Sequence, residues 1–155
     1  MKILGFSIAR WALALDAAEV GAVLAWPPLL AHLPGAPPWL LGIILDESRA
    51  LPLVDVTGLF DEGSATPGAT HTLLCKAGGF ALPVSAPCPF VATATGGSDS
   101  AAMPADIPPS ITRGMVSAAG KTIARFDGAA VIALATRRCA SWWSGWESEV
   151  DGTKR

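Results

Sequence analysis

The tripeptide Gly120, Lys121 and Thr122 is the part of the sequence most similar to a motif that does chemistry. A loop that cradles phosphate needs a glycine, four further residues and then Gly-Lys-Ser/Thr, followed at once by a helix whose amides point at the phosphate. Met115 stands where that first glycine is required. A strand is predicted after Thr122 instead of a helix, so a nucleotide-binding enzyme is an alternative that the sequence disfavours.

His71 and Cys75 are the other pair whose types suggest a site, because imidazole and thiolate both bind metals. No third and fourth ligand stand at a useful spacing, so ordinary strand residues are the better interpretation. Serine, histidine and aspartate all occur, but no Gly-x-Ser-x-Gly turn is present to expose a nucleophile. We therefore expect no catalytic residue, no metal and no cofactor.

The composition favours a packed scaffold. The chain has 155 residues, of which 51% are hydrophobic and 15% charged, which suits one domain and excludes extensive disorder. Its net charge of −2 provides no basic face for a phosphate backbone, so no nucleic-acid partner is expected. The scarcity of histidine and tyrosine disfavours acid–base catalysis. Three widely spaced cysteines are expected to be reduced thiols: Cys75, Cys88 and Cys139.

A membrane-spanning helix is not expected, although 26 residues between Glu19 and Asp46 carry no formal charge. Five prolines interrupt that stretch, and each interior proline removes a backbone donor and clashes with the preceding turn. Arg10 and Asp16 interrupt any signal-peptide core. A cytoplasmic location is therefore predicted.

The elements that would position these residues are short strands, because apolar residues alternate with a period of two over much of the chain. Residues 91–109 are rich in Ala, Ser, Gly and Pro and predict a flexible loop. Residues 137–150 predict a C-terminal helix that lies across an open barrel end. The alternative is that Trp142, Trp143 and Trp146 form a platform on which a ligand stacks. Residues 151–155 are predicted to form a tail. Four hairpins are predicted, pairing 3–8 with 12–15, 40–45 with 50–56, 71–75 with 80–84, and 121–126 with 129–135 across Asp127 and Gly128.

One segment, residues 32–60, carries a more specific pattern. It reads HLPGAPPWLLGIILDESRALPLVDVTGLF. The segment resembles the signature of the CheW-like domain, found in chemotaxis coupling proteins and in the regulatory domain of the CheA kinase. The residues that match the family pattern are Leu33, Pro34, Ala36, Pro37, Trp39, Gly42, Ile43, Ile44, Pro52, Val54 and Asp55.

The resemblance implies a mainly β fold of two intertwined five-stranded SH3-like barrels, with an apolar interface between them and a short C-terminal helix. Residues 1–150 would form a single CheW-like domain, with one sub-barrel from 1–15 and 111–150 and the other from 20–90. The implied function is a non-enzymatic adaptor that links the cytoplasmic tips of chemoreceptors to the regulatory domain of a CheA-type histidine kinase. The alternative is a small β-barrel module that holds a hydrophobic ligand between its halves.

Local physics agrees with the pattern. Pro34 and Pro37 stiffen a crossing segment, and Gly42 lets the next strand begin without a side-chain clash. Pro52 inside an apolar run predicts a strand at an edge or a bulge. For Asp55 two roles stay open: it bonds nearby backbone amides at a strand end, or it is a solvated acid.

The resemblance also implies a partner surface, in which this chain departs from the family. At the tip of the hairpin over 40–56 the family usually carries Arg-Gly, where this chain has Glu47 and Ser48. Glutamate reverses the charge, so an acidic partner would be repelled, and restoring Glu47→Arg should strengthen association with a standard receptor tip. Ala22 stands where an acidic residue is common. The predicted partner-binding residues are Val20, Ala22, Leu41, Glu47 and Ser48.

Overall fold

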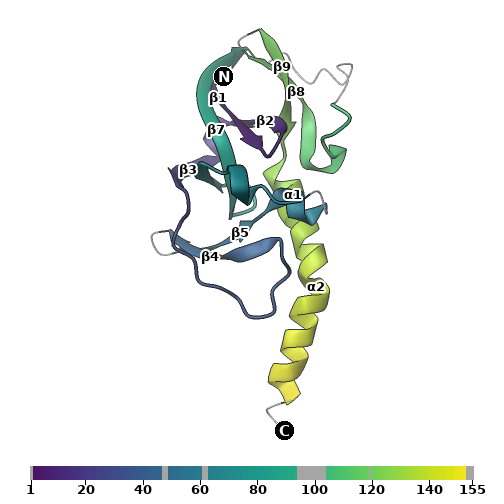
Figure 1. Ribbon diagram of the computed structural model, residues 1–155. Coiled ribbons are helices and arrows are strands. Elements are labelled where there is room, and N and C mark those ends of the chain that lie inside the picture. The colour runs from purple at the N-terminus through teal and green to yellow at the C-terminus, as the bar shows by residue number, and fades with distance from the viewer. Residues whose placement is uncertain (1, 47–48, 61–62, 94–103, 119, 153–155) are drawn as a thin grey trace.

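The structure, a computed structural model, describes residues 2–46, 49–60, 63–93, 104–118 and 120–152. Strands dominate it, as the period-two pattern predicts, and one long helix ends it (Figure 1). In chain order the elements are β1 (Lys2–Ile8), β2 (Trp11–Asp16), η1 (Ala17–Glu19), β3 (Val20–Ala25), β4 (Leu40–Asp46), β5 (Arg49–Val54), α1 (Val56–Leu59), η2 (Thr66–Gly68), β6 (His71–Cys75), β7 (Phe80–Thr93), η3 (Pro109–Ile111), β8 (Thr112–Ala118), β9 (Lys121–Phe126) and α2 (Gly128–Gly152).

Five strands form a closed circuit of pairings, here called the first ring. The order is β1-β2-β9-β8-β7, and β7 pairs back to β1. All neighbours are antiparallel except β2 and β9, which run parallel and pair at Leu13 with Ala124 and at Ala14 with Arg125. The ring is seen nearly end-on in Figure 1.

The second sheet has the order β3-β6-β7-β5-β4, and it shares β7 with the first ring. Residues 80–84 of β7 pair with β6, whereas residues 85–93 pair with β1 and β8. Residues 85–90 therefore pair within the first ring, whereas the prediction had placed them in the sub-barrel formed by residues 20–90. One long strand can serve two sheets because its residues exchange neighbours halfway along it.

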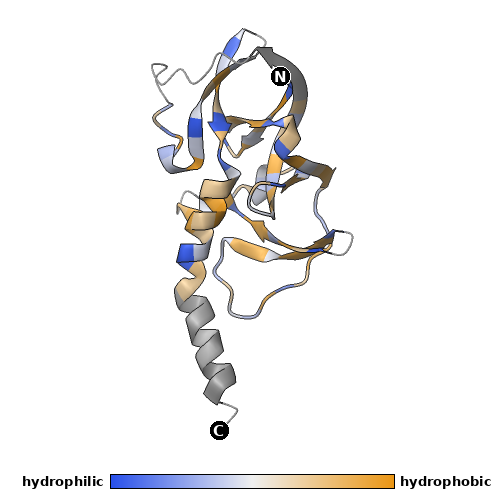
Figure 2. Cartoon of the chain, turned by 180° about the vertical axis from the view of Figure 1, so that it is seen from behind, coloured by the Kyte–Doolittle hydropathy of each residue, from blue (hydrophilic) through white to orange (hydrophobic). Residues whose placement is uncertain are grey.

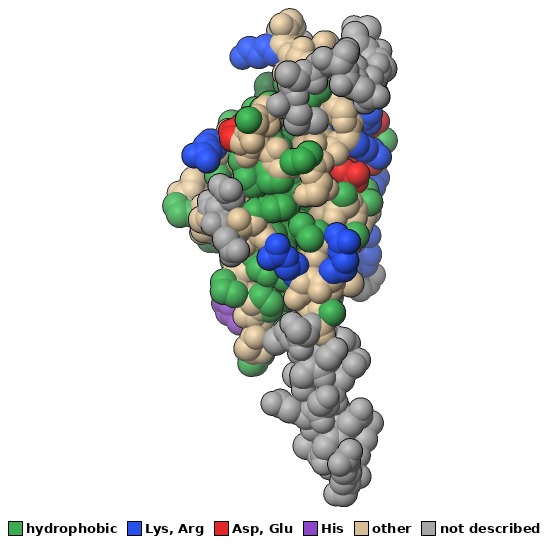
Figure 3. Space-filling view, turned by 90° about the vertical axis from the view of Figure 1, so that its right-hand side faces the viewer, with side chains coloured by type: hydrophobic (Ala, Val, Ile, Leu, Met, Phe, Trp, Pro, Cys, Tyr) green, Lys and Arg blue, Asp and Glu red, His purple; other side chains and the backbone are tan. Residues whose placement is uncertain are grey.

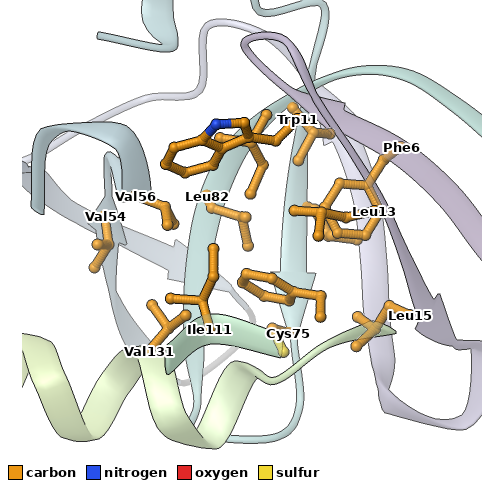
Figure 4. Close-up of a cluster of buried hydrophobic side chains, with 14 of the residues drawn as sticks. Phe6, Trp11, Leu13, Leu15, Val54, Val56, Cys75, Leu82, Ile111 and Val131 are labelled. Atoms are coloured by element: carbon orange, nitrogen blue, oxygen red, sulfur yellow. The ribbon is translucent and has the colours of Figure 1, made fainter. Parts of the chain in front are cut away.

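The largest core lies between the two sheets. Phe6 packs edge-on against Phe126, with ring centroids 5.7 Å apart, and α2 adds Val131 and Ala135 from the side. Figure 2 shows that the turns of α2 nearest the body are hydrophobic. Figure 4 shows side chains from both sheets meeting in this core with side chains from α1 and η3. Those from the sheets include Trp11, Leu13, Leu15, Val54, Cys75 and Leu82, and those from α1 and η3 are Val56 and Ile111.

The predicted hairpin across Asp127 and Gly128 is wrong beyond β9. A helix begins at Gly128, and the carboxylate of Asp127 accepts a hydrogen bond from the amide of Ala130 at 3.0 Å. Asp127 thus caps the helix instead of opening a turn. Val131 and Ala135 are four residues apart, which places both on the buried face of the helix. The terminal helix consequently starts at Gly128 and not at residue 137.

The other three predicted hairpins are confirmed, with small shifts. Trp11 belongs to β2, and β7 runs to Thr93, so the predicted loop 91–109 begins with three strand residues. It ends in the first residue of η3, Pro109. Residues 94–103 of that loop, and 153–155 of the predicted tail, lie outside the described residues.

Candidate functional site

The outer strand β4 of the second sheet is joined to β3 by a crossing segment, residues 26–39. Ala31 of this segment pairs with Ile43, each amide donating to the other carbonyl at 2.8–2.9 Å. A Cβ on Gly42 would lie 2.8 Å from the carbonyl oxygen of Ala31, so only glycine allows this approach. The segment thereby covers part of the sheet edge that β4 would otherwise expose.

Two leucines stand out on this edge. Leu29 is 95% exposed and Leu45 is 80% exposed. Each lies two residues from the bridge between Ala31 and Ile43: Leu29 in the crossing segment and Leu45 in β4. Val23 and Leu24 on β3 are also exposed. We call Leu29 and Leu45 the exposed leucine pair.

The predicted partner-binding residues do not form one group. Ala22 and Leu41 are partly buried and pack against the same cluster within the second sheet. Val20 packs instead against the large core between the sheets. Glu47 and Ser48 lie outside the described residues.

The crossing segment contains the proline-rich part of the family pattern. It turns twice: the amide of Ala36 donates to the carbonyl of Leu33 at 3.2 Å, and that of Leu40 to the carbonyl of Pro37 at 3.0 Å. Pro34 and Pro37 fix φ at or beside these turns. The segment therefore enters β4 in a defined direction.

Pro52 was predicted at an edge or a bulge. β5 is not an edge strand, because it lies between β4 and β7. Leu53 with Ala81 is the one pair that joins β5 to β7 among the described residues, and the register of β4 against β5 shifts between Leu40 and Gly42. Proline is tolerated here because few ladder bonds are needed on the β7 side.

Asp55 is buried and organises the turn that follows β5. Its carboxylate accepts hydrogen bonds from the hydroxyls of Thr57 at 2.9 Å and Ser64 at 2.6 Å, and from the amide of Ala65 at 3.2 Å. Of the two roles that the sequence left open, the geometry agrees with the bonded one. A carboxylate surrounded by donors in this way holds backbone in place and is not presented to a substrate.

The residues whose side chains could bind a metal or act as a nucleophile make structural contacts instead. His71 bonds the neighbouring hydroxyl of Thr70 at 2.8 Å through Nδ1, and the thiol of Cys75 donates to the carbonyl of Ala77 at 3.2 Å. Burial, with a smaller effect from the charge of Glu19, raises the pKa of Cys75 to about 11. No group of three potential metal ligands occurs within the described part of the chain.

Lys121 begins β9, and a strand follows it in place of the helix that a phosphate loop requires. On the face shown in Figure 3, Lys and Arg side chains are separated by hydrophobic and other groups instead of forming one continuous basic patch. Among the described residues, no helix is long and apolar enough to cross a bilayer.

A cavity of about 580 Å³ at the first ring was not predicted from the sequence. It lies where β2 and β9 part, and β1, β7 and residues 104–107 also border it. Alternation within strands could not reveal it, because it depends on which strands become neighbours in the closed ring. The exposure of Leu29 and Leu45 was missed for a similar reason: it depends on how the crossing segment lies against β4.

These features can be compared with known proteins. A model of the CheW-like domain family matches residues 2–87, more than half of the chain. The chain belongs to the CheW-like family. Its β-rich fold and its resemblance over residues 32–60 are thereby confirmed. CheW-like proteins of this kind are non-enzymatic coupling adaptors, so this chain is a chemotaxis scaffold or adaptor and not an enzyme.

A solved CheW-like structure has the same fold. The scaffolding protein TtCheW from Thermoanaerobacter tengcongensis superposes with a TM-score of 0.57 and 19% sequence identity. The match covers 81% of this chain and 87% of that one. A search of curated proteins found no match. At this identity the likeness establishes the CheW-like fold, while the family model carries the assignment to a coupling role.

Proposed function

We propose that this chain is a cytoplasmic adaptor that links the cytoplasmic tips of chemoreceptors to the regulatory domain of a CheA-type histidine kinase. The family match over residues 2–87 is the observation that carries the proposal. Such an adaptor transfers no chemical group; it acts by holding two partners together and favouring one state of the kinase. The structural contacts of His71, Cys75 and Asp55 are consistent with a protein that has no reaction centre.

The exposed leucine pair supports a docking surface on the second sheet. Exposed leucines scattered singly are ordinary, but two that each lie two residues from the bridge between Ala31 and Ile43 would form a small apolar patch at this edge. Leu45 is the last residue but one of β4, and the resemblance implies partner contacts at the residues that follow this strand. Burying both side chains against a partner would remove them from water, at about 1.5–3 kcal/mol for each leucine. Ala22 and Leu41 pack against the cluster that contains Ile44, the residue before Leu45 in β4.

The test is to titrate the chain separately against a receptor cytoplasmic tip and a kinase regulatory domain by calorimetry. We expect the double variant Leu29→Ser with Leu45→Ser to bind at least one of them about tenfold or more weakly, which corresponds to about 1.4 kcal/mol. Ala133→Ser, at an exposed position of α2, is the control and should bind normally. If the unaltered chain binds neither partner, the adaptor proposal fails. If it binds but the double variant is unimpaired, the docking surface is wrong.

We further propose that one partner surface has diverged in charge at Glu47. Arginine there would recover a fork that matches carboxylates, so Glu47→Arg should tighten binding to a standard receptor tip by several-fold at low salt. Raising the ionic strength should remove that gain, because it is electrostatic. The control is Glu47→Gln, which removes the charge without adding a fork and should give a smaller gain. Unchanged or weaker binding by Glu47→Arg would contradict this divergence.

A further inference from the structure

The cavity at the first ring has a defined position in the strand pattern. β2 and β9 pair at Leu13 with Ala124 and at Ala14 with Arg125. Residues before these pairs line the cavity on both strands, among them Ala12 and Ile123. Its volume of about 580 Å³ lies within the range of roughly 300–1,000 Å³ that small-molecule sites occupy.

Small side chains keep this space open. Ser7 of β1 pairs directly with Ala12 of β2, and Gly5 of β1 pairs with Cys88 of β7. Directly paired residues point to the same face of a sheet, and all four line the cavity. A methyl, a hydroxymethyl, a thiol and a hydrogen atom fill little volume where larger side chains would close the gap. The wall that they form is mainly apolar.

The rim of the cavity carries more positive than negative charge. Because β2 and β9 are parallel with Leu13 beside Ala124, Arg10 and Lys121 stand three residues before that pair, at the same end. Both line the cavity, as does Asp106, whose carboxylate lies 4.0 Å from the Arg10 guanidinium. Among the described residues that line the cavity, two cations stand against one carboxylate, so this part of the lining has a net positive charge. An apolar wall with a cationic rim complements an amphipathic anion.

We propose that this cavity binds a small amphipathic carboxylate, with its apolar part beside Ser7, Ala12 and Ile123 and its carboxylate at the rim near Lys121. The site lies on the first ring, apart from the exposed leucine pair, and it does not depend on the proposed adaptor function. It differs from a ligand held between the two halves, because all the strands that border it belong to one ring.

The test uses decanoate as the probe, kept below its micelle concentration, against the full chain in calorimetry or an NMR titration. Two probes of the same chain length serve as comparisons: 1-decanol is neutral and decyltrimethylammonium is cationic. We expect saturable binding of decanoate, about tenfold tighter than that of the cation. Saturating decanoate should also slow the alkylation of Cys88 by N-ethylmaleimide, because that thiol lines the cavity.

Two variants separate the parts of the proposal, each with a matched control elsewhere. Lys121→Gln should remove the preference for decanoate over decanol, whereas Lys76→Gln, on the β6–β7 turn, should keep it. Ala12→Leu should abolish binding of every probe, whereas Ala133→Leu on α2 should not. If Ala12→Leu fails to fold, Ala12→Val replaces it, with a smaller loss expected. Binding that survives Ala12→Leu in a folded protein, undiminished binding by Ala12→Val, no saturation by decanoate, or equal binding of all three probes would overturn the proposal.

Discussion

The first ring and the second sheet are each built from five strands and share β7, but side chains fill them differently. The second sheet contains a cluster of Ile44, Leu51, Leu53, Leu74 and Ala81, supported by four more partly buried apolar residues. The corresponding cluster of the first ring has three buried members, Ile3, Ala14 and Val116, with Ile123 beside them. A cavity of about 580 Å³ adjoins Ile123. Similar strand architecture thus gives a packed unit in one place and an unfilled space in the other.

The difference means that the second sheet contributes more packing energy to stability, whereas the first ring has space to bind a ligand. Side chains packed at the density of a crystal lose both transfer energy and contacts when they are shortened. Side chains that border an existing cavity make fewer packing contacts, so shortening them should reduce the free energy of unfolding by less. The second sheet should therefore tolerate core truncation poorly, and the first ring should tolerate it better.

The largest expected effect is that of Leu53→Ala. Leu53 is fully buried, and it is the residue of β5 that pairs with both β4 and β7. We expect a loss of about 2–5 kcal/mol in the free energy of unfolding, measured by urea titration with an unchanged m-value. The matched truncation in the first ring is Ile123→Ala, which should cost about 1–2 kcal/mol because Ile123 borders the cavity. Equal losses for the two variants would contradict the contrast between the sheets.

A smaller effect is expected for Gly42→Ala, which tests how the second sheet completes its edge. The new methyl would stand 2.8 Å from the carbonyl of Ala31, so the crossing segment must move away and the two bonds between Ala31 and Ile43 must lengthen. We expect a loss of about 1–3 kcal/mol together with faster proteolysis within residues 26–39.

Gly120→Ala is the control for that variant, in the β8–β9 turn of the first ring. Its φ is +75°, and a Cβ there would meet nothing within 4 Å. The cost should be about 1 kcal/mol, from backbone strain alone. If Gly120→Ala is as damaging as Gly42→Ala, the close approach of Ala31 is not what makes glycine necessary at position 42.

Strand positions could be predicted from the sequence because alternation is local. The pattern over residues 3–15 requires only that neighbours along the chain alternate, and β1 and β2 appear where it places them. Asp127 and Gly128 were misread because a turn and a helix cap favour the same residue types. What decides between them is the helix beyond, whose Val131 and Ala135 are buried by elements distant in sequence.

The candidate site was predictable to a lesser degree, because its surfaces depend on pairing between distant strands. The segment 32–60 carried the family, but the place of the exposed leucine pair depends on how the crossing segment meets β4 at the bridge between Ala31 and Ile43. The cavity follows from a parallel pairing of β2 with β9, more than a hundred residues apart along the chain. No local pattern encodes either of these contacts.

The smallest effect on stability, and the sharpest contrast in reactivity, is expected for two cysteines. Cys88 borders the cavity of the first ring and is exposed, whereas Cys75 of the second sheet is buried and bonded to the carbonyl of Ala77. At pH 8 a thiol reagent should label Cys88 within minutes and leave Cys75 unmodified while the protein is folded. Cys139, partly buried on α2, should react at an intermediate rate, because burial raises its pKa and limits access.

The pH dependence follows from the pKa of Cys75, which burial raises from the ordinary value of 9.0 to about 11. The folded state then prefers the neutral thiol more strongly than the unfolded state does. Cys75 therefore contributes its full stability below pH 9, and that contribution is lost as the pH rises toward 11. Unfolding measured from pH 8 to 11 should show a decline that Cys75→Ala removes and that Cys88→Ala leaves in place. If the decline persists in Cys75→Ala, groups other than Cys75 cause the pH dependence. In the labelling experiment, rapid modification of Cys75 at pH 8 would show that the second sheet is more open than its packing implies.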